Sequence, residues 1–184
     1  MTRQLDVLFV RASSLETNYQ ALSKKFAAKE MPAWTGLLAN HIRTRGFVTA
    51  IIDAECEDLT IDETVKRIGE INPRICCFIA EGANPNSSSQ SMIGLARTAE
   101  QLKQDYPKVK ILAGGQHVNA LPQEVLTKHS FIDFALQNEG AYTCSQLCAV
   151  ENLNDEYFLG KVQGLVWRDR ENNLNFNEIG GIIP

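Results

Sequence analysis

The chain has 184 residues, of which 44% are hydrophobic, and its interspersed charged residues give a formal net charge of -4. This size and composition fit one domain with a real core plus an extension. No basic stripe points to a nucleic-acid partner, and no apolar run reaches membrane-spanning length. The first residues lack the apolar stretch of a signal peptide, so we expect a cytoplasmic protein.

The first half of the chain alternates short apolar runs with helical patterns. After the first run, residues 11–31 form a long polar loop, a kind of loop that is often functional in compact domains. A helix opens at Pro32 and ends at Gly46. Another helix begins at Thr60, where Glu63 three residues later predicts a capping box. The apolar runs predict buried strands at residues 5–10, 47–53 and 74–80.

The second half continues this alternation around a central apolar run, Val109–Ala113, that leads into Gly114 and Gly115. A loop rich in turn-forming residues, 81–89, precedes it. The remaining predicted elements are a helix at 90–105, a short helix at 121–127, a strand at 131–136 and a helix at 142–150. Strand–helix units with nearly continuous apolar strands predict an α/β fold. We expect a doubly wound, five-stranded parallel sheet of flavodoxin-like or Rossmann-like type, with strand order 2-1-3-4-5.

The last part of the chain has a different pattern. Two apolar stretches, 162–168 and 174–176, flank a polar turn, which predicts a hairpin. Residues 180–184 are typical of a linker to a further domain. We therefore expect a ligand-binding domain over residues 1–150 and a hairpin with a linker over 151–184. On this interpretation the chain is a fragment without catalytic activity of its own.

The odd number of cysteines, in a chain without an export signal, predicts free thiols. Cys76 and Cys77 are adjacent in a strand and therefore point to opposite faces of the sheet. Cys144 and Cys148 share a helix face and have the spacing of the first two cysteines of the CxxxCxxC iron–sulfur motif. The third position of that motif is Glu151, so we interpret these thiols as packing residues.

The loops after four of the predicted strands lie on one rim, because the carboxyl ends of parallel strands meet at the edge where ligands bind. These loops are residues 11–18, 81–89, 114–119 and 138–142. These loops contain no GxGxxG or GxxxxGK[ST] sequence, which argues against dinucleotide and P-loop nucleotide binding. A phosphorylated receiver would need clustered acidic residues after the first strand, and a flavodoxin would need a phosphate loop there. The double glycine is compatible with a plain turn or with close approach to a ligand.

Short motifs along the chain occur in an order that matches a known family. The motifs are Pro32–Leu38, Arg45–Phe47, Asp53–Glu55, Ile71–Pro73, Gly114–His117, Leu121–Glu124, Ile132–Phe134, Glu139–Thr143 and Gly164–Arg168. Their order resembles the cobalamin-binding domain that precedes the catalytic barrel in cobalamin-dependent radical S-adenosylmethionine enzymes. Each motif alone is degenerate, and their order over nearly the whole chain carries the resemblance.

The resemblance implies a corrinoid over the strand ends, with its nucleotide tail running down beside the double glycine. Serine hydroxyls suit the ribose and phosphate of the tail, and Asn and Gln side chains suit the amide arms of the corrin. The residues expected to contact cobalamin are Ser13, Ser14, Glu81, Gly82, Ala83, Asn84, Ser87, Ser88, Gly114, Gly115, Gln116, His117, Asn119, Glu139 and Gly140. Gly115→Leu is expected to abolish corrinoid retention and to leave the fold intact.

One departure from the pattern concerns the cobalt ligand. Cobalamin domains of the methionine-synthase type carry Asp-x-His-x-x-Gly after the first strand, whereas residues 11–16 of this chain contain no His. We therefore assign no metal ligand. His117 lies on the same rim, and we favour a role in orienting the corrin or its tail over a role as cobalt ligand.

The function that the resemblance implies is a cobalamin-binding module of a radical S-adenosylmethionine methyltransferase or a related radical enzyme. The domain would position cobalamin for methyl transfer or radical chemistry. The parent enzyme would also use S-adenosylmethionine and a 4Fe-4S cluster, held by a following barrel domain. Two alternatives stay open, a stand-alone corrinoid carrier or sensor and a flavodoxin-like flavin-binding domain.

Overall fold

The computed structural model describes residues 4–14, 31–82 and 85–179, which build one seven-stranded sheet. The strands are β1 (Val7–Arg11), β2 (Thr49–Asp53), β3 (Ile75–Ala80), β4 (Lys110–Gly115), β5 (Phe134–Leu136), β6 (Leu165–Arg168) and β7 (Leu174–Phe176). Strands β1 to β5 are parallel in the order 2-1-3-4-5, and β6 and β7 extend the sheet in antiparallel pairing. The predicted α/β fold and strand order are confirmed.

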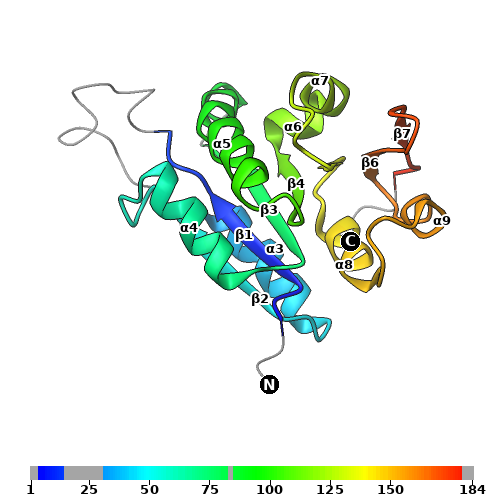
Figure 1. Ribbon diagram of the computed structural model, residues 1–184, viewed down its shortest axis with the longest axis horizontal. Coiled ribbons are helices and arrows are strands. Elements are labelled where there is room, and N and C mark those ends of the chain that lie inside the picture. Colours follow the sequence, from blue (N-terminus) through cyan, green and yellow to red (C-terminus); the bar gives the residue numbers. More distant parts are fainter. Residues whose placement is uncertain (1–3, 15–30, 83–84, 180–184) are drawn as a thin grey trace.

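Helices cover both faces of this sheet (Figure 1). They are α3 (Ala33–Thr44), α4 (Ile61–Ile71), α5 (Pro85–Asp105), α6 (Gln116–Ala120), α7 (Pro122–Lys128), α8 (Ala141–Ala149) and α9 (Glu156–Leu159). Helices α4, α5, α6 and α7 pack into the core on one face. Helices α3, α8 and α9 pack into the core on the other.

The strand sequences explain why both faces are covered. Every residue of β3 is buried, and its alternate side chains enter opposite cores, as Cys76 and Cys77 do. Burying one large apolar side chain stabilises the fold by about 1.5–3 kcal/mol, so a strand apolar on both sides favours two covering layers. Cys144 and Cys148 pack together in the core on the α3 and α8 face. All of the cysteines are free thiols, as predicted.

Local signals set several helix ends. The Thr60 hydroxyl accepts a hydrogen bond from Glu63 N at 3.2 Å, and the Glu63 carboxylate accepts one from Thr60 N at 2.9 Å. This reciprocal pair confirms the predicted capping box at the start of α4. Pro32 is the N-cap of α3, and Gly46 follows its end with φ 84, a conformation that favours glycine.

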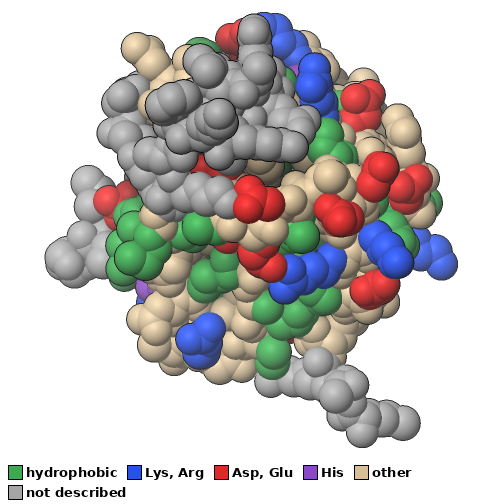
Figure 2. Space-filling model, turned by 90° about the vertical axis from the view of Figure 1, so that its left-hand side faces the viewer, with side chains coloured by type: hydrophobic (Ala, Val, Ile, Leu, Met, Phe, Trp, Pro, Cys, Tyr) green, Lys and Arg blue, Asp and Glu red, His purple; other side chains and the backbone are tan. Residues whose placement is uncertain are grey.

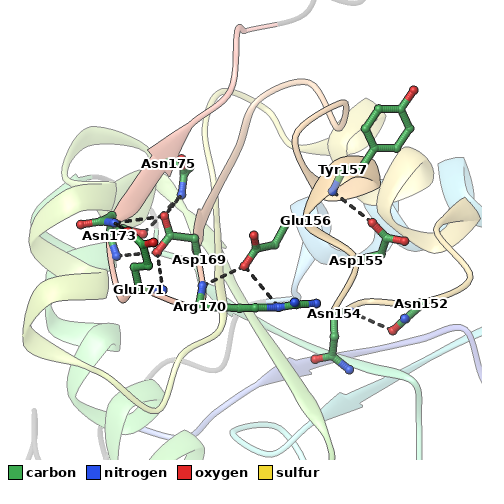
Figure 3. Close-up of polar contacts among 10 residues, drawn as sticks. All are labelled: Asn152, Asn154, Asp155, Glu156, Tyr157, Asp169, Arg170, Glu171, Asn173 and Asn175. Atoms are coloured by element: carbon green, nitrogen blue, oxygen red, sulfur yellow. Dashed lines mark hydrogen bonds and ion pairs between the residues drawn. The ribbon is translucent and has the colours of Figure 1, made fainter.

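The predicted hairpin is present and belongs to the main sheet, because β6 pairs with β5. Asp169 organises its turn by accepting hydrogen bonds from Asn173 N at 2.8 Å and Glu171 N at 3.0 Å (Figure 3). Helix α9 precedes the hairpin and was not predicted, since a four-residue helix shows no periodicity. The domain limit at residue 150 stays a prediction.

Two surface properties bear on possible partners. In the described part of the chain, no helix is both long enough and apolar enough to cross a membrane. Acidic and basic side chains are intermixed on the face drawn in Figure 2, with hydrophobic side chains between them. This mixture agrees with the interspersed charges of the sequence.

Candidate functional site

A pocket of about 660 Å³ opens at the carboxyl ends of β3, β4 and β5, the edge at which open α/β sheets bind ligands. Its volume lies within the usual range of ligand sites, about 300–1,000 Å³. The start of α3, the segment after β3, helix α6 and the segment after β5 surround it. The lining residues are Ala33, Trp34, Leu37, Ile79, Ala80, Glu81, Gly82, Gly115, Gln116, Asn119, Gln137, Asn138, Glu139 and Ile179.

The residues predicted to contact cobalamin fall into three groups with respect to this pocket. The lining includes Glu81, Gly82, Gly115, Gln116, Asn119 and Glu139. The predicted residues that the structure places outside the lining are Ser13, Ser14, Ser87, Ser88, Gly114, His117 and Gly140. Ala83 and Asn84 lie outside the described residues.

One wall of the pocket is apolar and comes mainly from the start of α3. Trp34 and Leu37 lie one helical turn apart, and Ile179 after β7 joins them. Leu37 is 61% exposed, whereas Leu38 and Ile42 of the same helix are buried. Sequence reasoning missed this wall because an apolar residue beside a ligand site follows the same helical spacing as a core residue.

Glu81 holds the start of this wall in place. Helix α3 has no side-chain cap of its own at Pro32. The Glu81 carboxylate reaches over from the end of β3 and accepts hydrogen bonds from Trp34 N and Thr35 Oγ1, each at 2.7 Å. Unpaired N–H groups and the helix dipole favour a carboxylate at this place. The Glu81 carboxylate therefore lines the pocket while it is hydrogen-bonded to the start of α3.

A second wall is polar and carries four amide side chains. Gln116 and Asn119 project from α6, and Gln137 and Asn138 follow β5. We predicted a loop at residues 114–119, but α6 occupies most of it, and positions three apart on a helix share a face. The buried Asn119 Oδ1 has no hydrogen-bond partner among the described residues. A buried acceptor of this kind needs a donor from a bound molecule, either water or a ligand.

The two glycines of the double glycine serve different needs. Gly115 has φ +107, and a Cβ there would lie 2.2 Å from the Ala80 carbonyl oxygen. Any side chain at Gly115 would meet the β3 backbone, so the expectation that Gly115→Leu leaves the fold intact is wrong. A Cβ at Gly114 would meet only side-chain ends, Leu136 Cδ1 at 2.7 Å and Ile79 Cδ1 at 3.1 Å. Ile79, whose side chain packs against Gly114, is itself a lining residue of the pocket.

The serine-rich stretch after β3 lies in a helix rather than in the predicted loop, because α5 begins at Pro85. Ser88 is buried, donates to the Ala80 carbonyl oxygen at 2.6 Å and accepts from His117 N at 3.1 Å. The Ser89 hydroxyl lies 2.8 Å from His117 Nδ1. These contacts tie α5 to β3 and to the start of α6. His117 therefore engages α5 and does not line the pocket.

The serines after β1 are also engaged by α5. The Ser14 hydroxyl accepts from Gly94 N at 3.1 Å and donates to the Ser91 carbonyl oxygen at 3.2 Å. A Cβ at Gly94 would lie 2.3 Å from the Ser13 carbonyl oxygen, so the two segments touch through their backbones. Ser13 and Ser14 thus pack the end of β1 against α5.

The end of β1 carries an ion-pair cluster where cobalamin domains of the methionine-synthase type place their histidine segment. Arg11 lies 3.7 Å from the Asp53 carboxylate and also pairs with Glu55. All three side chains are nearly buried. The chain therefore offers an engaged guanidinium at the end of β1, and the lack of a cobalt ligand stays a prediction.

Comparison with known proteins identifies the family. The B12 binding domain family matches residues 19–148 of the chain. The chain belongs to this family. Strand order and pocket position agree with the match, because the pocket lies at the ligand-binding edge of the sheet.

Solved structures of cobalamin-dependent radical enzymes share this fold. The radical S-adenosylmethionine methyltransferase TsrM from Kitasatospora setae, with cobalamin and a [4Fe-4S] cluster bound, aligns over 100% of this chain and 30% of its own, with a TM-score of 0.68 and 11% identity. The cobalamin-dependent S-adenosylmethionine radical enzyme OxsB, with aqua-cobalamin and S-adenosylmethionine bound, aligns over 96% of this chain and 22% of its own, with a TM-score of 0.63 and 16% identity. Together with the family match, these structures confirm the predicted resemblance.

Curated relatives include two anaerobic magnesium-protoporphyrin IX monomethyl ester cyclases. The protein from Synechocystis sp. is 28% identical over 165 residues, which are 88% of this chain and 31% of the cyclase. The protein from Rubrivivax gelatinosus is 25% identical over 134 residues, which are 71% of this chain and 22% of the cyclase. The chain thus spans less than a third of the length of these relatives.

The lining of the pocket fits part of a cobalamin. Its volume of about 660 Å³ suits one portion of such a cofactor rather than the whole of it. The apolar wall suits the carbon framework of a corrinoid, and the amide side chains suit its polar arms. The orphan Asn119 Oδ1 is matched by an amide N–H, which corrin arms provide.

Proposed function

We propose that this domain holds cobalamin for a radical S-adenosylmethionine enzyme, with the corrin over the carboxyl edge of the sheet. One observation carries the proposal: the predicted contact residues Gln116, Asn119 and Glu139 converge on a single pocket at that edge. Open α/β sheets bind ligands there, and membership of the B12 binding domain family names the ligand.

When bound, cobalamin supplies a cobalt centre suited to methyl transfer or radical chemistry. The residues of this chain bind and orient it. Trp34 and Leu37 offer apolar surface to the edge of the ring system. Gln116 and Asn119 bond its amide arms, and Asn119 Oδ1 thereby gains the donor that no described residue supplies.

The remaining predicted contacts belong to the nucleotide tail in this proposal. The tail runs past Ile79, whose side chain packs against Gly114, and Glu139 accepts from a ribose hydroxyl next to Gly140. Ser87, in the first turn of α5, offers a hydroxyl to the phosphate. Ser88 acts through the fold, by holding the starts of α5 and α6 together.

We further propose that the chain is one part of a longer radical enzyme that uses S-adenosylmethionine and a 4Fe-4S cluster in a following barrel. The lengths of the relatives support this, because each extends well beyond the matched region. TsrM favours methyl transfer as the chemistry, and the two cyclases favour a ring-forming reaction. Cys144 and Cys148 pack in the core, so the cluster ligands come from elsewhere. Free thiols support a cytoplasmic location.

The test is retention of cobalamin by the purified chain. After incubation with hydroxocobalamin and desalting, we expect a red protein whose absorption spectrum gives about one cobalamin per chain. Leu37→Asp places a charge in the pocket wall and should abolish retention. Ile93→Asp is the matched control, because Ile93 is also an exposed apolar residue but lies on α5 outside the lining.

A colourless protein after desalting would contradict cobalamin binding. Retention of flavin from a parallel incubation with flavin mononucleotide would favour the flavodoxin-like alternative. A stand-alone carrier or sensor would also retain cobalamin. A downstream reading frame with CxxxCxxC would favour the enzyme module over that alternative.

A further inference from the structure

We propose that the pocket selects corrinoids whose arms are neutral amides and disfavours corrinoids that carry a free carboxylate. The inference rests on the proposed cobalamin function and adds a specificity to the same pocket. It follows from the charges and hydrogen-bonding groups of the lining.

The described lining residues carry acidic and amide groups and no Lys, Arg or His. The two carboxylates are Glu81, which α3 engages through two hydrogen bonds, and Glu139, which is exposed at the rim. A ligand carboxylate entering this lining would meet like charge without a compensating cation. An amide arm carries no charge and would meet no such repulsion.

Asn119 adds a requirement for a donor. Its Oδ1 is buried and has no hydrogen-bond partner in the described part of the chain, and an amide arm provides an N–H group for it. An ionised carboxylate has acceptors only, so the orphan oxygen would face a second acceptor. Hydrogen bonding and charge repulsion therefore both favour an amide arm over a carboxylate.

The expected size of the effect is that of a single pair of like charges, Glu139 and the carboxylate of the ligand. Two like charges about 6 Å apart, in an effective dielectric constant of about 40, weaken binding about tenfold. Salt reduces the contribution of an exposed carboxylate such as Glu139. The hydrogen-bonding contribution of Asn119 is short-ranged and much less sensitive to salt.

The experiment compares hydroxocobalamin with the isomeric cobalamin monocarboxylic acids, in each of which one propionamide arm is hydrolysed. Dissociation constants are measured with the whole chain at pH 7.5, where the free carboxyl group is ionised, by titration of the absorption spectrum. We expect the isomer whose acid enters the pocket to bind about tenfold more weakly than hydroxocobalamin. Glu139→Gln should reduce that difference by at least about threefold, whereas Glu100→Gln, on an exposed position of α5, should leave it unchanged.

The outcomes separate this proposal from the function on which it rests. If hydroxocobalamin binds and all of the isomers bind equally well, the selectivity is wrong and cobalamin binding stands. A difference that Glu139→Gln does not reduce also overturns the role given to this carboxylate. If hydroxocobalamin itself is not retained, the proposed function falls and the selectivity falls with it.

Discussion

Two flanks of the carboxyl edge carry similar polar residues and use them differently. The serine flank comprises Ser87, Ser88, Ser89 and His117, at the starts of α5 and α6. The amide flank comprises Gln116, Asn119, Gln137 and Asn138, which line the pocket. Ser88 and His117 are bonded to neighbouring elements, whereas Asn119 Oδ1 has no partner within the described residues. Polar residue type alone therefore does not distinguish a side chain that holds the fold together from one that is available to a ligand.

The largest effect is expected at the double glycine, which lies between the two flanks. Gly115→Ala should destabilise the fold by about 3–5 kcal/mol, because it combines a glycine-only backbone conformation with a backbone clash. Gly114→Ala should cost about 1 kcal/mol, because only the ends of Leu136 and Ile79 must shift. Urea unfolding measures both. Equal loss of stability in the two variants would contradict the separate roles given to the glycines.

A pair of alanine substitutions compares the flanks directly. Ser88→Ala should lower the free energy of unfolding by about 1–3 kcal/mol, because it leaves the buried Ala80 carbonyl and the His117 N–H unpaired. Asn119→Ala should change stability by less than about 0.5 kcal/mol and weaken cobalamin binding several-fold. Unfolding and binding titrations are needed for both variants. The comparison fails if Ser88→Ala affects binding alone, or if Asn119→Ala affects stability alone.

A smaller effect is expected at Glu81. This residue lines the pocket, but its carboxylate is hydrogen-bonded to a neighbouring element, as the residues of the serine flank are. Glu81→Ala should lower stability by about 1 kcal/mol, because α3 loses its only described cap. Hydrogen exchange should accelerate at Trp34 N, the donor to that carboxylate. Glu81→Gln keeps one amide oxygen as acceptor and should recover part of the protection. Unchanged exchange at Trp34 N in Glu81→Ala would show that α3 is held in another way.

The smallest effect is expected at the hairpin, where a carboxylate is engaged entirely by its own turn (Figure 3). The backbone N–H of Asn173, followed by weaker hydrogen bonds, holds the pKa of Asp169 below its ordinary value. A lowered folded pKa contributes stability above the unfolded value of about 3.9, and this contribution is lost as pH falls through the folded pKa. Asp169→Asn should therefore reduce stability slightly at pH 6 and leave it unchanged near pH 2. A variant that loses equal stability at both pH values would contradict the assignment.

Much of the fold could be predicted from the sequence because its strands are buried on both faces and read as uninterrupted apolar runs. The capping box at Thr60 and Glu63 is equally local and was found for that reason. Residues 85–89 were harder, since serine and asparagine favour both turns and helix starts, and only tertiary contacts show which they adopt. The exposed wall at Leu37 was missed because periodicity does not tell whether an apolar side chain meets a core or a cofactor.

The number of antiparallel strands after β5 decides at which edge of the sheet the chain emerges. A single antiparallel strand after β5 would leave the chain at the amino edge of the sheet. Two such strands return it to the carboxyl edge, where β5 ends. Ile179 lies at that edge and contributes to the pocket wall. A domain joined to the chain beyond it by a short linker would be held beside the pocket at a millimolar-range effective concentration. If the proposed function holds, the hairpin sets the point at which such a domain would meet the corrinoid.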